Sequence, residues 1–217
     1  MGKHLRRDLD LLKKDILTMG ALVESATNKA IAAFTRRSED LAREVLICDD
    51  EIDDKENEVE DLCLKILALH QPVAFDLRFV VMVLKFNHDL ERMGDIATHI
   101  AEQTLVLLNK PSLAVQFPIA EMGEAVRAMV RDCLDALVRS DANLARTVCA
   151  ADDRVDAMHR KMFDAVELQV KEGNAEFDHA VRMLSMSRYL ERIADHATNI
   201  AEDIVFMVDG EVIRHGT

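Results

Sequence analysis

Carboxylate side chains recur at helical spacing in two separate stretches of this 217-residue chain. In each stretch, charged or polar residues follow one another at intervals of four, four and three positions, so they share one face of a helix. The two sets are Glu91, Asp95, His99 and Glu102, and then Glu191, Asp195, Asn199 and Glu202. Acidic pairs four residues apart are common on solvated helices, so the duplication is the more informative signal.

A second acidic pair precedes each of these faces. If the chain folds into one helical hairpin about residue 72 and another between residues 173 and 174, each earlier acidic pair lies opposite the acidic face that follows it in the same half. In the first half Asp53 then faces Glu91 and Asp49 faces Asp95; in the second half Asp156 faces Glu191 and Asp152 faces Asp195. We therefore expect four carboxylates to converge across each hairpin.

Clustered carboxylates repel one another unless a positive charge neutralises them, and a multivalent metal ion is the simplest neutralising group. Oxygen ligands suit Mg, Ca, Mn or Fe, and a neighbouring imidazole at His99 admits Fe or Zn. The prediction is one metal site or cluster per half, with Fe or Zn favoured. Arg92 and Arg192 offer the alternative source of positive charge. The apolar phase of the helix turns Glu91 and Asp95 outward, so we expect sites on the surface.

The acidic faces belong to an internal repeat. Residues 90–102 read LERMGDIATHIAE and residues 190–202 read LERIADHATNIAE, with nine of thirteen positions identical. The chain is therefore built from two copies of one unit. We place the boundary at Asn109, ahead of Lys110-Pro111-Ser112, which gives units 1–109 and 110–217.

Apolar residues spaced three and four apart, with few glycines and prolines, predict long helices throughout. Ser38 and Ser140-Asp141 are expected N-caps, Gly173 is an expected helix stop, and Pro72 and Pro118 are expected in first helical turns. The six predicted helices cover about 5–37, 38–70, 72–108, 118–139, 141–172 and 176–208. Short connections make neighbouring helices antiparallel, so the predicted fold is all-α, with two tandem, sequence-related three-helix bundles.

Composition narrows the class of protein further. Apolar residues make up 49% of the chain, which is enough for a core, and the formal net charge of −13 disfavours binding to nucleic acid phosphates. The four cysteines form no paired motif, the first residues are charged, and no apolar run approaches a membrane span. The sequence predicts a soluble cytoplasmic protein.

Two other functions compete with a metal-binding regulatory role. A carboxylate-bridged di-iron oxidase requires two Glu-x-x-His motifs facing one bundle core, and only Glu176 and His179 have that spacing. A purely structural helical scaffold would carry the acids as solvated faces and bind no metal tightly.

The sequence resembles the PhoU family of accessory and regulatory proteins of phosphate-specific transport. The resemblance rests on QPVAFDLRF at 71–79, LERMGD at 90–95 and LERIAD at 190–195, and covers nearly the whole chain. The second half has no QPVA-like turn. In this family paired E(D)xxxD motifs hold metal clusters, which assigns that role to Asp49/Asp53 with Glu91/Asp95 and to Asp152/Asp156 with Glu191/Asp195. His99 corresponds to Asn199, so the two sites are expected to differ.

The resemblance implies regulation and not catalysis. Proteins of this family link the ATPase subunit of a phosphate importer to a membrane sensor histidine kinase, and they keep the phosphate-starvation response off when phosphate is plentiful. They typically form homodimers. The expectation for this chain is thus a cytoplasmic adaptor, peripheral to membrane complexes without being inserted in the membrane.

Overall fold

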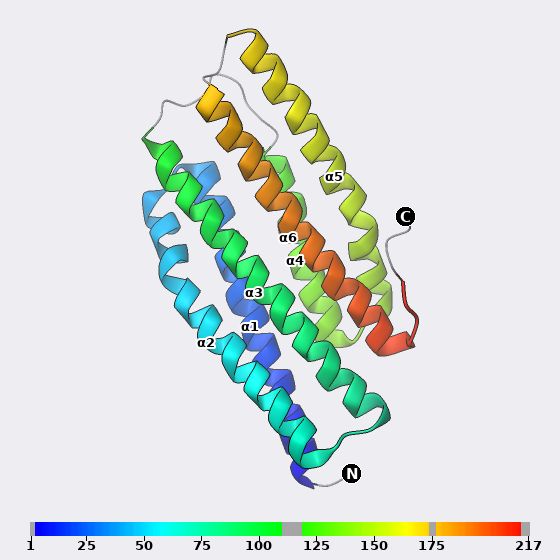
Figure 1. The fold of residues 1–217 in the computed structure, drawn as a ribbon. Coiled ribbons are helices and arrows are strands. Elements are labelled where there is room, and N and C mark those ends of the chain that lie inside the picture. The colour runs from blue at the N-terminus through cyan, green and yellow to red at the C-terminus, as the bar shows by residue number, and fades with distance from the viewer. Residues whose placement is uncertain (1–2, 110–118, 174–176, 214–217) are drawn as a thin grey trace.

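The structure is a computed structural model that describes residues 3–109, 119–173 and 177–213. Within these ranges the chain folds into six α-helices and contains no strand (Figure 1). The helices are α1 (Lys3–Arg36), α2 (Glu39–His70), α3 (Ala74–Leu108), α4 (Ile119–Arg139), α5 (Ala142–Lys171) and α6 (Phe177–Asp209). The all-α prediction is confirmed.

Local signals in the sequence placed most helix ends correctly. The Ser38 hydroxyl caps α2 by accepting a hydrogen bond from the Leu41 amide at 3.4 Å. Asp141 caps α5 by accepting from the Asn143 amide at 2.9 Å. After α5, Gly173 adopts a left-handed φ of 72°, as a helix stop requires. These ends depend on short-range hydrogen bonds and backbone preferences, which neighbouring residues determine.

The expected start of the third helix was wrong by two residues. Pro72 does not lie in the first turn, because α3 begins at Ala74. Gln71 ends α2 in a left-handed conformation (φ 45°, ψ 58°), and Val73 is extended ahead of α3. Proline disfavours α conformation in the residue before it, so the chain makes a turn here. The expected starts at Pro118 and residue 176, and the boundary at 109/110, involve residues outside the described ranges.

The first three helices pack on one another, as do the last three, and the two groups meet through α3 against α6 and α1 against α4. In Figure 1, α3 and α6 lie side by side at the centre of the molecule. The buried apolar residues of all six helices form one continuous core. No helix in the described part of the chain has the length and apolar character that crossing a membrane requires.

The contact between α1 and α4 repeats itself about an approximate two-fold axis. A β-carbon on Gly20 of α1 would stand 2.7 Å from Cδ2 of Leu134 in α4. A β-carbon on Gly123 of α4 would stand 2.7 Å from Cγ2 of Ile31 in α1. Since Gly123 is the repeat counterpart of Gly20, and Leu134 that of Ile31, the same pair occurs twice. The two helices approach closely at both glycines, and at Gly123 the facing methyl group is fixed on a branched β-carbon.

Candidate metal centres

The first group of potential ligands joins α2 to α3. Glu56 on α2 and His88 and Glu91 on α3 each offer one ligand atom, and these atoms all lie within 4.8 Å of one another. Two carboxylates and an imidazole at this spacing form a mixed oxygen and nitrogen donor set. Such a set fits Fe or Zn better than it fits Mg or Ca.

Glu91 is the most perturbed carboxylate of this group. Only 14% of its side chain is exposed. Burial, and next the neighbouring charge of Asp95, raise the pKa of Glu91 to about 7. The Arg92 guanidinium opposes this rise: its Nε lies 3.3 Å from Glu91 Oε2, and its Nη1 donates to Asp95 Oδ2 at 3.0 Å. The Arg92 guanidinium thus neutralises part of the negative charge of this group, which is the alternative to a metal ion that the sequence offered.

The other predicted ligands of the first repeat lie along the same two helices. Asp49 Oδ1 accepts a hydrogen bond from Thr98 Oγ1 at 2.9 Å. Asp53 is largely exposed. The loss of part of its hydration, and next the charges of Asp49 and Asp95, raise its pKa. The close group nevertheless pairs Glu91 with Glu56, three residues beyond Asp53.

This offset in the first hairpin follows from its turn. Folding the chain about residue 72 assumed that α3 starts at Pro72, whereas the helix starts at Ala74. The later start moves the centre of the hairpin toward higher residue numbers, so each α3 residue meets a later residue of α2.

The second group joins α5 to α6 and consists of predicted residues. Asp152, Asp156 and Asp195 offer carboxylate oxygens that all lie within 4.8 Å of one another. Burial and the charge of Asp156 raise the pKa of Asp195. Glu191 is 13% exposed, and its Oε2 lies 2.7 Å from Arg188 Nη1. Burial, and next Asp195, raise the pKa of Glu191. This all-oxygen donor set suits hard cations.

Two predicted ligands lie elsewhere, at the contact between the repeats. The His99 ring stacks on Tyr189 of α6, with ring centroids 5.6 Å apart. Asn199 Nδ2 donates to Asp89 Oδ1 of α3 at 3.4 Å. These two contacts correspond to each other in the internal repeat. Among the described residues, His99 is in neither of the two closely spaced groups of acidic and histidine side chains.

From the sequence, Glu56 was not a predicted ligand, and His88 was considered as one but judged to be a satisfied, semi-buried polar group. Each lies one helical turn from a predicted ligand, because Glu56 follows Asp53 by three residues and His88 precedes Glu91 by three. The duplication hid them because their counterparts, His159 and Arg188, are different residue types. His159 contacts Ser187, with Nδ1 2.9 Å from Oγ. Identity between the two repeats therefore does not mark this part of the site.

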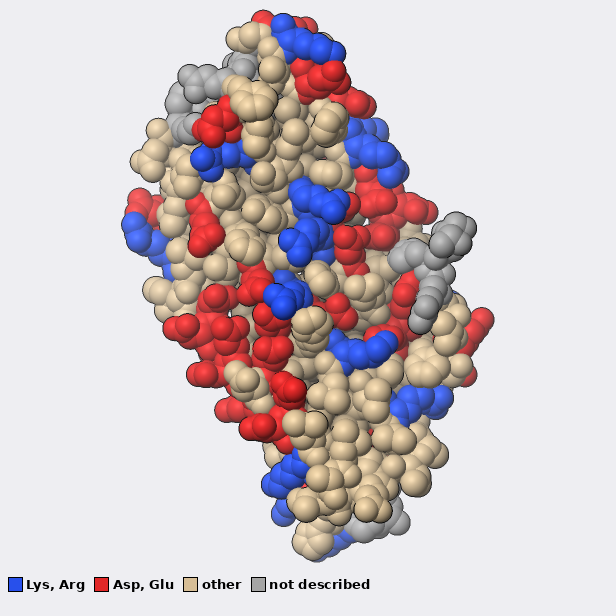
Figure 2. All heavy atoms as spheres, in the orientation of Figure 1, with Lys and Arg blue, Asp and Glu red and all other residues tan. Residues whose placement is uncertain are grey.

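Charge also distinguishes the two repeats. Residues 49–61 of α2 contain nine acidic residues and one lysine, whereas residues 152–164 of α5 contain four acidic and three basic residues. Figure 2 shows acidic side chains gathered over α2 at the lower left of the molecule. The first repeat thus presents its cluster on a strongly acidic surface.

Two groups outside the carboxylate clusters bear on the catalytic alternatives. Ser187 lies beside His159 but is fully buried and donates its hydroxyl to the Leu184 carbonyl at 3.0 Å, so it is not poised as a nucleophile. For the oxidase hypothesis, His179 is buried and Glu176 lies outside the described residues. The fold and clusters define an all-α protein of two related three-helix bundles, each with carboxylates gathered between its second and third helices.

Comparison with known families agrees with this description. The model of the PhoU domain matches residues 16–104 and again residues 119–204. The chain belongs to the PhoU family. The double match places one domain of the family on each internal repeat.

Curated relatives and solved structures cover nearly the full chain. A Thermotoga maritima protein named phosphate-specific transport system accessory protein PhoU homolog 1 is 35% identical over 212 residues, which is 97% of this chain and 91% of the relative. An Aquifex aeolicus protein named phosphate-specific transport system accessory protein PhoU homolog is 36% identical over 211 residues, which is 97% of this chain and 96% of the relative.

The crystal structure of PhoU from Pseudomonas aeruginosa matches with a TM-score of 0.92 at 33% identity, covering 95% of this chain and 99% of that one. The phosphate transport system regulatory protein PhoU from Streptococcus pneumoniae matches with a TM-score of 0.89 at 28% identity, covering 97% and 99%.

Proposed function

We propose that this protein is a metal-binding regulatory adaptor of phosphate uptake and signalling. It holds metal ions at the two carboxylate clusters and links a phosphate importer, through its ATPase subunit, to a sensor histidine kinase. When phosphate is plentiful, the adaptor keeps the starvation response off and acts in the cytoplasm as a homodimer. The observation that carries this proposal is the pair of clusters on a chain whose relatives are named accessory proteins of phosphate transport.

The residues present fit metal binding by their chemistry. Glu91 and Glu191 each have Oε2 shielded from solvent beside other acids, and in each case this oxygen lies next to one arginine, Arg92 or Arg188 respectively. Several carboxylates around a single guanidinium leave negative charge that a metal ion can neutralise. We assign Fe or Zn to the cluster with His88, and Mg, Mn or Ca to the all-oxygen cluster of the second repeat.

Elemental analysis of the purified, untagged protein tests the metal sites. Two variants each disable one cluster: His88→Asn with Glu91→Gln, and Asp156→Asn with Asp195→Asn. A control, Asp61→Asn with Asp164→Asn, changes two exposed carboxylates outside both clusters. Each cluster variant is expected to lose the metal of its own repeat, and the control is expected to keep both.

Metal absent from the wild-type protein even after reconstitution would contradict this part of the proposal. The clusters would then be better explained as electrostatic docking surfaces for basic partners.

The regulatory role has its own test in the source organism. Deleting the gene is expected to switch on phosphate-starvation genes in high phosphate, and the wild-type gene should restore repression. Restoration by the control variant but not by the cluster variants would connect metal to regulation. Full repression in the deletion strain would contradict the adaptor function while leaving the metal sites intact.

A further inference from the structure

The turn that joins α2 to α3 exposes several apolar side chains. Val73 is 74% exposed and Leu69 is 67% exposed, and Leu64, Phe75 and Leu77 are exposed as well. Large apolar side chains on a protein surface usually stand singly, whereas these five occur between residues 64 and 77. Such a concentration is typical of a surface that contacts another molecule.

The start of α1 lies beside this turn. Asp8 Oδ2 of α1 is 2.9 Å from Nε2 of His70, the last residue of α2. Figure 1 shows the first turns of α1 and the connection from α2 to α3 together at the lower end of the molecule. We call this end the first tip and define it as residues 3–13 and 62–81.

The first tip has a net charge opposite in sign to that of the whole protein. It contains six lysines and arginines and three aspartates, in a chain whose formal net charge is −13. The acidic stretch of α2 ends at Asp61, nine residues before the end of the helix, which is about 13 Å along its axis. In Figure 2 the acidic side chains gather higher, over α2, and the lower end is mostly uncharged with basic side chains at its edge.

Part of the positive charge at the first tip is available to another molecule. Asp8 is buried and already accepts a hydrogen bond from Arg7 Nη2 at 2.8 Å. Lys3, Arg6 and Lys65 are exposed, and none of the ion pairs found among the described residues involves them. These three side chains can therefore meet a negatively charged surface without first breaking an internal contact.

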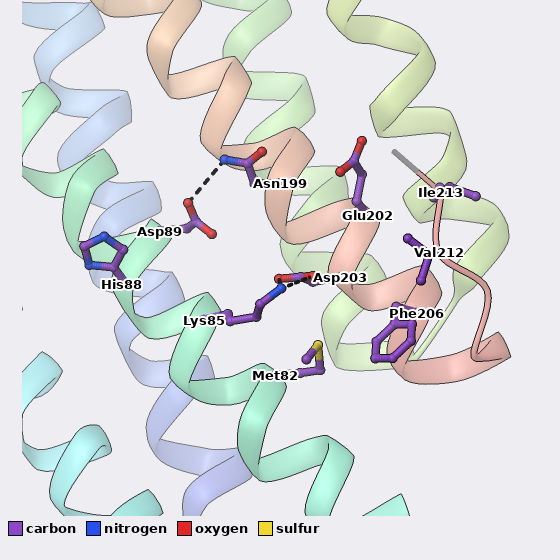
Figure 3. A pocket seen from close by; sticks show the side chains of 10 residues that line it. All are labelled: Met82, Lys85, His88, Asp89, Asn199, Glu202, Asp203, Phe206, Val212 and Ile213. Carbon is purple, nitrogen blue, oxygen red and sulfur yellow. Dashed lines mark hydrogen bonds and ion pairs between the residues drawn. The ribbon is translucent and has the colours of Figure 1, made fainter. Parts of the chain in front are cut away.

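The cavity between α3 and α6, of about 450 Å³, differs in this respect (Figure 3). Lys85 donates to Asp203 at 2.7 Å. Asp89 lies 2.8 Å from His196 Nδ1 and accepts a hydrogen bond from Asn199. These charges are compensated within the protein, whereas part of the charge at the first tip is not.

The shape of the first tip favours a broad surface as its partner. The cavity that Phe75 lines together with α1 holds about 160 Å³, which is below the usual range for small-molecule sites. Leu69 and Val73 do not line this cavity, and they lie at the turn at the end of the bundle. An apolar end with a basic border fits a surface that is negatively charged outside and apolar beneath, as an anionic bilayer is.

We propose that the first tip docks on the surface of an anionic lipid bilayer. Leu69 and Val73 enter the boundary between headgroups and acyl chains, and Lys3, Arg6 and Lys65 bind lipid phosphates. Neither a few apolar side chains nor a few charges alone give stable binding, so the two act together. The acidic stretch of α2 stays farther from the headgroups than the Debye length of about 8 Å at physiological salt. The docking depends neither on metal in the clusters nor on the regulatory role.

The second repeat offers a comparison within the same chain. At the turn between α5 and α6, Phe177 is 75% exposed, and Leu168 and Val181 are exposed as well. Residues 165–181 contain one lysine and four acidic residues, whereas their counterparts at 62–81 contain two basic residues and one acidic residue. The two turns share apolar exposure and differ in charge, so an anionic bilayer should distinguish them.

Flotation of the full-length protein with lipid vesicles tests the docking. Vesicles of phosphatidylcholine alone are compared with vesicles in which about a third of the lipid is phosphatidylglycerol. The protein is expected to bind the anionic vesicles at least about tenfold more tightly than the neutral ones, and added salt should weaken this binding by screening the charges.

One pair of variants tests the apolar contact. Leu69→Ser with Val73→Ser should weaken binding to the anionic vesicles about tenfold, because less apolar surface enters the bilayer. The control, Leu168→Ser with Phe177→Ser, makes the same kind of change at the turn of the second repeat and should leave binding unchanged.

A second pair of variants tests the charges. Arg6→Gln with Lys65→Gln should weaken binding to the anionic vesicles about tenfold. The control, Arg131→Gln with Lys161→Gln, removes the same charge at exposed positions of α4 and α5 and should have no such effect.

A fluorescent reporter identifies the side chains that meet the lipid. The chain contains no tryptophan, so a single introduced one reports on its own position. The emission of Val73→Trp should shift to shorter wavelength on addition of anionic vesicles, and that of Phe177→Trp should not. The two positions are matched in exposure.

Four results would overturn the proposal. These are no binding of the wild-type protein to either kind of vesicle, equal binding to both, an equal loss in the control variants, and equal spectral shifts at the two tryptophan positions. In the first case an acidic protein would replace the bilayer as the partner of the first tip.

Discussion

Gly123 of α4 packs against Ile31 of α1, so closely that a β-carbon on the glycine would stand 2.7 Å from Cγ2 of the isoleucine. The repeat counterpart of this pair is Gly20 against Leu134, where a β-carbon on the glycine would stand 2.7 Å from Cδ2 of the leucine. The two contacts differ in how easily the neighbour can move. Cγ2 of isoleucine is fixed on its branched β-carbon, whereas Cδ2 of leucine lies at the end of a flexible side chain.

The first prediction follows from that difference. Gly123→Ala should destabilise the protein by about 1–2 kcal/mol, because overpacking exceeds the gain in helix propensity. Gly20→Ala should be nearly neutral, since Leu134 can rotate away. Urea denaturation of both variants measures the two values, with Ile31→Ala added to Gly123→Ala as the relief control. Equal costs at the two glycines would contradict this account of the contact.

The second prediction concerns pH and Glu91. Its pKa of about 7 in the folded protein exceeds its ordinary value of 4.5. Between these values the metal-free folded protein holds a proton that the unfolded chain has released, so the free energy of unfolding falls as pH rises through this window. Glu91→Gln cannot ionise and should flatten this dependence. The variant should be about 1 kcal/mol more stable than wild type above the window.

Denaturation of the chelator-treated protein across this pH range provides the measurement. Below pH 4.5 the variant and the wild type should have similar stability, because Glu91 is then protonated in both the folded and unfolded states. An identical pH slope in the two proteins would show that Glu91 ionises normally.

The third prediction concerns the contact between the repeats. His196 Nδ1 of α6 lies 2.8 Å from Asp89 Oδ1 of α3, and both side chains are largely buried. A double-mutant cycle with Asp89→Ala and His196→Ala should give a coupling energy of about 1 kcal/mol. The exposed Arg139–Asp135 pair within α4 serves as comparison and should give about 0.5 kcal/mol or less. Coupling no larger than that of the exposed pair would mean that this contact does not hold the repeats together.

The fourth prediction concerns the thiols. Burial raises the pKa of Cys63 to about 12 and that of Cys149 to about 11. Burial also raises the pKa of Cys133, whose Sγ donates to the Ala197 carbonyl at 3.3 Å. Because the thiolate is the reactive form, these three should react slowly with a thiol reagent at pH 8 in the native protein and rapidly in denaturant.

Mass spectrometry of the labelled protein identifies which cysteines have reacted. Rapid native labelling of Cys63 or Cys133 would contradict the buried positions of these side chains.

The sequence predicted the elements of the fold because their signals are local. Apolar spacing defined the six helices, and Ser38 and Asp141 cap α2 and α5 through hydrogen bonds to amides within three residues. The internal repeat also predicted that each half would carry the same arrangement. In the second repeat, hairpin geometry was sufficient to bring Asp152 and Asp195 into one group.

Tertiary structure alone decided which side chains meet across the helices. The turn around Pro72 sets the register of α2 against α3, so Glu91 joins Glu56 and His88. The packing of α3 on α6 places His99 on Tyr189. Such contacts depend on turn conformations and on how whole helices pack, and both are set by interactions between residues far apart in the sequence. Periodicity along one helix determines which face a residue occupies, and only the packed structure determines what that face meets.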